Sequence, residues 1–203
     1  MKEFLIATGN AGKMREFEHL FSGFDVKLYS LRDFPEFEPP EEDGATFSDN
    51  AYKKAYSAAL ATGLTVIADD SGLCVDALDG RPGVFSARFA GVGAGDEANN
   101  QKLVEDLSGF VLKSRTAEFR CVIALCSPDG ASSFFQGGLK GIILENPSGS
   151  GGFGYDPLFM VPEYGKTLAE LSLVIKNRIS HRGRACGALQ EFLIKNEIIK
   201  SNA

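Results

Sequence analysis

The chain has 203 residues, of which 44% are hydrophobic and 24% charged, a composition typical of a globular protein with a sizeable core. Its formal net charge of -6 excludes a broad, sequence-independent nucleic-acid surface, which needs a basic face, but allows a local basic pocket for a small anion. No apolar run approaches the roughly 18–20 residues of a membrane span and the first residues lack a signal-peptide core, so we expect a cytoplasmic protein with no nucleic-acid or membrane partner.

The first residues predict alternating strands and helices. Residues 3–8 favour a strand, and residues 11–21 favour an amphipathic helix with Asn10 as its N-cap. A second strand near residues 26–29 precedes a loop rich in Pro and Glu at 34–43. This order is typical of α/β proteins.

A longer helix and a short buried strand come next. Residues 46–62 predict a helix that a glycine ends, and Thr46 and Asp49 have the spacing of a capping box. Residues 64–68 are apolar and partly β-branched, which favours a strand, and we interpret Asp-Asp-Ser-Gly at 69–72 as the turn that ends it.

The second half predicts a hairpin among further helices. Another short strand covers 73–75 and a helix covers 96–107. Two long strands, 115–126 and 132–143, flank the turn Ser-Pro-Asp-Gly at 127–130.

The remaining residues predict a loop and two helices. A Gly-rich loop spans 147–156, a capping box at 167–170 opens a short helix, and a last helix covers about 180–195. We expect an α/β fold with a mixed sheet and flanking helices. Since no linker separates independent domains, residues 1–203 are expected to form one domain with two lobes around a cleft.

Asp69 and Asp70 are the most informative pair in the chain. Carboxylates are costly to bury alone, so each is expected to face water, a cation or a hydrogen-bond partner. Neighbours on a strand point to opposite faces, so one can serve a site while the other braces the turn. The alternative is a solvated turn without chemistry.

The loop Thr8-Gly-Asn-Ala-Gly-Lys13 has the features of a phosphate cradle. Its glycines allow tight turning, and the free N–H groups of a helix N-terminus favour an anion. Lys13 adds a positive charge, although the spacing is not that of a Walker A loop. The alternative is a plain strand–helix connection.

The segment 149–154 matches Gly-x-Gly-x-x-Gly, but we reject a dinucleotide fingerprint there. Such a motif must open a helix, which Pro157 and Pro162 forbid. We expect a flexible loop that presents Phe153 and Tyr155 for stacking on a nucleobase. The alternative is that these rings pack in the core.

Two further segments carry suitable side chains. His181 and Arg182 open the last helix, and with Lys176 they offer donors for a purine 6-oxo group or a phosphate; a capped, solvated helix start is the alternative. The acidic loop beginning at Glu41, together with Asp70, offers oxygen ligands of the kind that hold Mg²⁺ beside a triphosphate, although such loops are usually only solvated.

The four cysteines contain no Cys-x-x-Cys pair, and we interpret them as buried free thiols in a reducing compartment.

Five motifs together resemble the Ham1/RdgB family of inosine/xanthosine triphosphate pyrophosphatases and cover nearly the whole chain: Thr8–Lys13, Glu41–Lys54, Ala68–Leu73, Gly151–Pro157 and Ser180–Arg182. The resemblance implies a Maf/Ham1-like fold with an elongated sheet and a nucleotide-binding cleft. It also implies a Mg²⁺-dependent hydrolase that converts ITP, dITP or XTP to the monophosphate and pyrophosphate, and a homodimer.

The resemblance implies roles for single residues. Glu41 and Asp70 are the implied Mg²⁺ ligands, and Asp70 is also the implied catalytic base, which takes the proton of the attacking water or orients that water through the metal. The implied substrate contacts are Thr8, Gly9, Asn10, Ala11, Gly12, Lys13, Lys54, Ser71, Phe153, Gly154, Tyr155, Asp156, Lys176, His181 and Arg182. One departure is Asp49-Asn-Ala51, where the family usually has Glu-Asn-Ala, which puts any role of position 49 in doubt.

Donors such as Arg182 satisfy a 6-oxo group but not a 6-amino group, which excludes adenine better than guanine. Rejection of GTP is therefore implied only by the resemblance. Two alternatives remain: a pyrophosphatase of other nucleotides like the Maf family, whose residue pattern is absent here, and a nucleotide-binding regulatory module without turnover, against which the set of acids argues.

Overall fold

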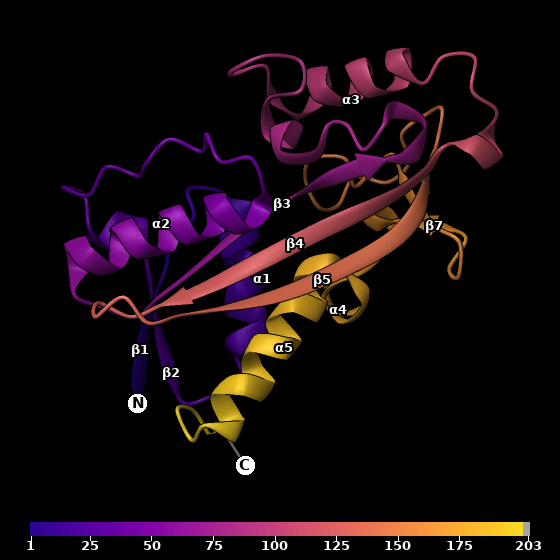
Figure 1. Ribbon diagram of the computed structural model, residues 1–203. Coiled ribbons are helices and arrows are strands. Elements are labelled where there is room, and N and C mark those ends of the chain that lie inside the picture. The colour runs from indigo at the N-terminus through magenta and orange to yellow at the C-terminus, as the bar shows by residue number, and fades with distance from the viewer. Residues whose placement is uncertain (201–203) are drawn as a thin grey trace. The chain divides into compact units, whose positions relative to one another are not determined.

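The computed structural model describes residues 1–200. Seven strands form one mixed sheet in the order β2-β1-β3-β4-β5-β6-β7, accompanied by helices (Figure 1), so the predicted mixed α/β class is confirmed. The chain divides into two compact units, which we call unit 1 (residues 1–70, 121–137 and 182–203) and unit 2 (71–120 and 138–181). Strands β3, β4 and β5 supply residues to both units. That the whole chain works as one domain around a cleft stays a prediction.

The elements of unit 1 alternate along the chain. They are β1 Lys2–Ile6, α1 Ala11–Phe21, β2 Val26–Ser30, the 3-10 helix η1 Leu31–Asp33, α2 Phe47–Thr62, and parts of β3 Val66–Val75, β4 Thr116–Cys126, β5 Ser132–Ile143 and α5 His181–Lys195. Strand β1 lies parallel to both β2 and β3, with Ile6 opposite Ile67.

Alternating side chains divide the core of unit 1 into two clusters. Phe4, Ile6 and Ile67 pack with residues of α1 and α5, such as Phe17 and Leu189. Val66 and Ala68, which point the other way, pack in a second cluster with alanines of α2. Continuing this alternation by one step, Asp69 must face the side of α1 and α5, and Asp70 the side of α2.

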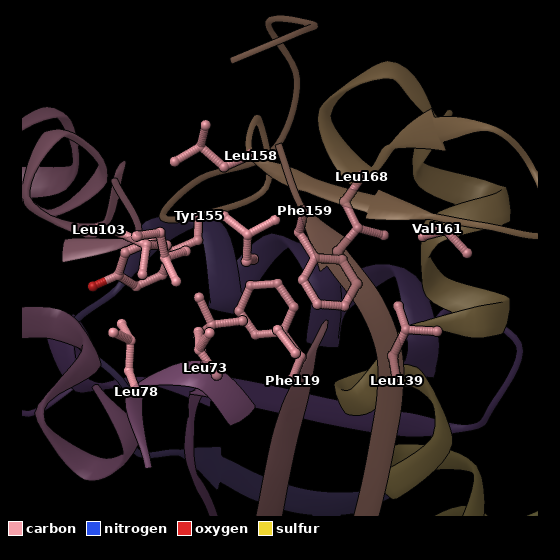
Figure 2. Packing of buried hydrophobic residues seen from close by; sticks show 14 residues of the cluster. Leu73, Leu78, Leu103, Phe119, Leu139, Tyr155, Leu158, Phe159, Val161 and Leu168 are labelled. Atoms are coloured by element: carbon pink, nitrogen blue, oxygen red, sulfur yellow. The ribbon is translucent and has the colours of Figure 1, made fainter. Parts of the chain in front are cut away.

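Unit 2 contains the remaining elements. Besides parts of the long strands, they are η2 Asp76–Leu78, η3 Gly83–Arg88, α3 Gly95–Asp106, η4 Leu112–Ser114, β6 Phe159–Val161, β7 Lys166–Thr167, η5 Leu168–Glu170 and α4 Leu173–Ile179. Strand β6 pairs antiparallel with both β5 and β7. Figure 2 shows the core of this unit, in which Phe119 and Phe159 pack among Leu73, Leu139 and Leu168.

The main predicted elements are confirmed, with small differences at their ends. Helix α1 has the predicted bounds, and Thr46 and Asp49 form the capping box that opens α2. The hairpin of β4 and β5 closes where the N–H of Ser127 donates to the oxygen of Ala131 at 3.0 Å. The capping box at Thr167 opens only the short η5, whereas β6, β7 and α4 had no clear sequence signal.

One local prediction is wrong. Asp69 to Gly72 do not form a turn, because β3 runs without a break from Val66 to Val75. Composition favoured a turn, but partners on both faces make two buried carboxylates tolerable in mid-strand. The prediction that the carboxylates face opposite ways holds, and the second of them cannot brace a turn that is absent.

Cys121, Cys126 and Cys186 are buried free thiols, as predicted, whereas Cys74 is a free thiol that is only half-buried. Burial raises the pKa of Cys186 to about 12. Within residues 1–200, no helix is long and apolar enough to cross a membrane.

Candidate active site

The loop before α1 uses part of its hydrogen-bonding capacity internally. Asn10 caps the helix, since its Oδ1 accepts from the N–H groups of Gly12 at 2.8 Å and Lys13 at 3.0 Å. The hydroxyl of Thr8 accepts in turn from the N–H of Asn10 at 3.2 Å. An anion bound at this turn therefore competes with Asn10 for the N–H groups of residues 12 and 13. The main positive charge of the loop is the ammonium group of Lys13.

Asp69 lies in a buried ionic cluster on the face of α1 and α5. Its Oδ2 is 3.0 Å from Nζ of Lys13 and 2.9 Å from Nη2 of Arg182. The Nε of Arg182 donates to the same oxygen at 3.2 Å, and the thiol of Cys121 lies 3.8 Å away. Nη1 of Arg182 binds the carboxylate of Glu16, which is also buried.

These contacts set the charge states of the cluster. Burial disfavours the charged form of Asp69, but the charges of Arg182, Lys13 and Lys54 outweigh it and hold the pKa of Asp69 well below its usual range. Burial likewise opposes the charge of Arg182, yet Asp69 and Glu16 raise its pKa. Asp69 therefore stays ionised at any working pH.

Asp70 has a different environment on the face of α2. Its Oδ2 accepts from the amide of Asn50 at 2.9 Å, and Nζ of Lys54 lies 3.9 Å from Oδ1. Burial raises the pKa of Asp70, and Lys54 and Asn50 only partly oppose that effect. Lys54 is shared, because it also binds Glu42 at 3.0 Å. Asp70 is thus a carboxylate with increased proton affinity next to a lysine.

Asn50 also fixes the acidic loop beside Asp70. Its Oδ1 accepts from the N–H of Gly44 at 2.8 Å, while its Nδ2 holds Asp70. A Cβ on Gly44 would lie 2.6 Å from Oδ1 of Asn50, so only glycine fits there. Asn50 thereby ties the loop to the carboxylate.

The acids fit a divalent cation that also takes ligands from a substrate. Glu41 is exposed, and its neighbour Glu42 binds Lys54, the same lysine that lies 3.9 Å from Asp70. Among residues 1–200 no cluster of three or more metal-binding side chains occurs. Mg²⁺ is usually held by one or two carboxylates plus phosphate oxygens, and Asp70 and the acids of the 41–42 loop are side chains of that chemical kind.

Unit 2 carries a second group, built around Asp156. Its Oδ2 accepts from Nζ of Lys176 at 2.6 Å and from the N–H of Phe153 at 2.9 Å, and both Asp156 and Lys176 are buried. Nζ of Lys176 lies 4.7 Å from the centre of the Phe153 ring, a cation–π contact. A Cβ on Gly152 would lie 2.0 Å from Oδ2 of Asp156. The loop is therefore held in place, and the sequence-based prediction of a flexible loop is wrong.

The two aromatic residues of this loop differ. Phe153 is half-buried, whereas Tyr155 is buried. The hydroxyl of Tyr155 donates to the backbone carbonyl oxygen of Ser86 at 2.8 Å. Burial raises the pKa of Tyr155. The core alternative therefore describes Tyr155, and Phe153 is the more exposed of the two rings.

The predicted residues are divided between the units. Unit 1 holds the 8–13 loop, Glu41, Lys54, Asp70 and Arg182; unit 2 holds Ser71, the 153–156 loop, Lys176 and His181. His181 is buried and its ring stacks on Phe119, with centroids 4.7 Å apart.

Sequence reasoning missed Glu16, Glu42 and Asn50. A signal existed for Glu16, which lies one helical turn after Lys13, and for Asn50, which stands inside the quoted Asp49-Asn-Ala51 motif. Glu42 was indistinguishable from its acidic neighbours.

Carboxylates beside lysines suit a metal and phosphates, and an aromatic ring held beside a lysine suits stacking on a nucleobase. The chain belongs to the Ham1 family, whose model matches residues 4–192.

Several named proteins are similar to this chain over nearly its whole length. A dITP/XTP pyrophosphatase of Geobacter sulfurreducens is 56% identical over 193 residues, covering 95% of this chain and 97% of the relative. One from Listeria monocytogenes is 49% identical over 195 residues, covering 96% of each chain. The solved Ham1 protein of Staphylococcus aureus has a TM-score of 0.85 at 44% identity, covering 96% of this chain and 100% of the other, and that of Coxiella burnetii has 0.87 at 42% with the same coverage.

Proposed function

We propose that this chain hydrolyses dITP, ITP and XTP to the monophosphate and pyrophosphate, removing non-standard purine nucleotides from the pool. The observation that carries the proposal is Asp70, a buried carboxylate whose pKa is raised and which lies beside Lys54. The names of the relatives, dITP/XTP pyrophosphatase, support the same substrates.

Asp70 is the proposed general base. Water attacks the α-phosphorus, and a carboxylate with increased proton affinity accepts the proton that this water loses. Asn50 holds one oxygen of Asp70 and so fixes the direction of the other. Lys54 and Lys13 offset the negative charge of the phosphates, which is usually the dominant contribution in phosphoryl chemistry.

Mg²⁺ is the proposed cofactor, with Asp70 and Glu41 as its predicted protein ligands. When bound, it supplies positive charge to the phosphate oxygens. Glu42 is a further candidate, because it and Asp70 lie near the same lysine.

We assign binding of the nucleobase to the unit 2 group around Asp156. Phe153 offers a ring for stacking, and Lys176 and His181 offer donors for a 6-oxo oxygen, which adenine lacks. Arg182 stays a predicted donor to the base, but Asp69 and Glu16 already occupy its three nitrogens. We therefore give Arg182 a further role, in which it holds Asp69 in position for Lys13.

A homodimer and a cytoplasmic location remain part of the proposal. Both come from the family resemblance and the composition of the chain. Size-exclusion chromatography with light scattering checks the first.

The deciding experiment is pyrophosphate release from dITP, ITP, XTP, dGTP and ATP, each with and without Mg²⁺. We expect pyrophosphate, not orthophosphate, only with the metal, and faster release from the first three. Binding of dITP without any turnover would instead establish a regulatory module. Faster turnover of other nucleoside triphosphates would establish a Maf-like activity.

A further inference from the structure

Helix α3 binds both backbone polar groups of Gly154, the residue that follows Phe153. The N–H of Gly154 donates to Oδ2 of Asp96 at 2.6 Å, and Nδ2 of Asn100 donates to the oxygen of Gly154 at 2.9 Å. Asp96 and Asn100 are four residues apart, so they project from the same face of the helix. Both contacts lie within unit 2.

The conformation of Gly154 explains why its polar groups need partners. Its φ is +61°, in the left-handed region that glycine adopts without strain. No regular strand or helix includes it, so its N–H and C=O have no partners from secondary structure. Asp96 and Asn100 supply these partners.

Only one end of the Asn100 side-chain amide, its Nδ2, makes the bond to Gly154. Its Oδ1 is buried and has no hydrogen-bond partner among residues 1–200. A buried acceptor without a partner costs stability. An apolar residue would avoid that penalty, so the bond to Gly154 is what this side chain provides.

Two carboxylates hold the peptide groups before and after the Cα of Phe153. Asp156 holds the N–H of Phe153, and Asp96 holds the N–H of the next residue. The hydroxyl of Tyr155 further fixes the loop to Ser86. The backbone that carries the ring is therefore fixed before and after the Cα of Phe153, and the direction of its Cα–Cβ bond is defined.

We propose that Asp96 and Asn100 are positioning residues for nucleobase binding, which act through Gly154 to hold the Phe153 ring ready to stack on a purine. The inference rests on the proposed function, and it adds α3 to the residues that determine substrate affinity. A ring held in place avoids the ordering entropy that a free loop loses when the base binds. Removing the two bonds therefore weakens binding without touching the acid that performs the chemistry.

The kinetic test compares Asp96→Ala, Asn100→Ala and the double variant with the parent. We expect KM for dITP to rise about ten-fold in each single variant, with kcat within about two-fold. The double variant should lose little more than the larger single loss, because both side chains hold the same residue, Gly154.

Two variants serve as controls. Asp96→Asn keeps an oxygen acceptor for Gly154 and should restore most of the affinity. Glu97→Ala removes an exposed carboxylate from the same first turn of α3, so it matches the loss of charge and of the helix-dipole interaction without loosening the loop. Its KM should equal that of the parent.

A second readout does not depend on turnover. The chain has no tryptophan, so Phe153→Trp introduces a single fluorescent probe at the ring position. Adding Asp96→Ala to this probe protein should lower its fluorescence anisotropy and increase acrylamide quenching, whereas adding Glu97→Ala should change neither.

The two readouts separate the inference from the proposed function. Unchanged anisotropy and unchanged KM in Asp96→Ala would overturn the inference, as would equal changes in kcat and KM accompanied by a lower melting temperature. If the parent released no pyrophosphate, the proposed function would fail. In that case loss of dITP binding by the probe protein carrying Asp96→Ala would still support the positioning role, and unchanged binding would overturn it.

Discussion

Asp69 and Asp70 are neighbours on β3, yet the two faces of this strand treat their carboxylates in opposite ways. On the side of α1 and α5, Asp69 lies within 3.0 Å of two cations, and its pKa is lowered. On the side of α2, Asp70 has one cation at 3.9 Å, which it shares with Glu42, and its pKa is raised. Both are buried, so the number and distance of the cations decide the direction in which each pKa shifts.

The opposite pKa shifts of Asp69 and Asp70 indicate a structural role for the first and a chemical role for the second. A carboxylate that never takes a proton under working conditions makes a good structural anion, whereas one with increased proton affinity makes a good base. We therefore assign Asp69 to holding Lys13 and Arg182, and Asp70 to the reaction.

The largest expected effect is on turnover. Asp70→Asn keeps the shape of the side chain but removes the charge that accepts a proton and binds a cation. We expect kcat for dITP to fall by at least about 100-fold, in line with loss of a general base. Circular dichroism should show a folded protein, and a folded variant with near-normal turnover would refute the role of Asp70.

On the other face, the main effect should be on stability. Arg182→Ala leaves Asp69 and Glu16 buried without their shared partner, which typically costs about 3–5 kcal/mol of unfolding free energy. Arg184→Ala, on the exposed side of the same helix, should cost less than about 0.5 kcal/mol.

Chemical denaturation measures both losses. A loss below about 1 kcal/mol in Arg182→Ala, with a narrower gap between ITP and ATP efficiencies, would return Arg182 to base recognition alone.

Lys13 connects the structural cluster to the substrate. Lys13→Ala should raise KM for all triphosphates about ten-fold, because a charged contact to phosphate is lost whatever the base. The ratio of dITP to dGTP efficiency should stay within about two-fold of the parent. A large change in that ratio would place Lys13 on the base.

The smallest effect is a dependence of stability on pH. Because the pKa of Asp70 is raised in the folded state, its contribution to stability is fully present below the unfolded value, about 3.9, and is lost as the pH rises through the folded value. Between pH 4 and 7, the unfolding free energy of metal-free Asp70→Asn should therefore rise relative to that of the parent, by about 1 kcal/mol or less. Urea unfolding at several pH values measures this difference, and a gap that shrinks with pH would contradict it.

Much of the fold and part of the candidate site could be predicted from the sequence, because local patterns determine them. The bounds of α1, the capping box of α2 and the opposite faces of Asp69 and Asp70 follow from periodicity and cap chemistry. The unbroken strand through Asp69 could not be predicted, because it depends on Arg182, which is distant in sequence. The same holds for Asp96 and Asn100, whose contact with Gly154 joins residues more than fifty positions apart.

The most direct test of the contrast between the two faces is the unfolding free energy of Asp69→Asn and Asp70→Asn, measured side by side at pH 7 without metal. Each variant removes one negative charge from adjacent positions with the same change of side chain. We predict that Asp69→Asn is less stable than the parent and that Asp70→Asn is as stable or more stable. The reverse order would show that Asp70 supports the fold and that Asp69 is the carboxylate held ready for chemistry.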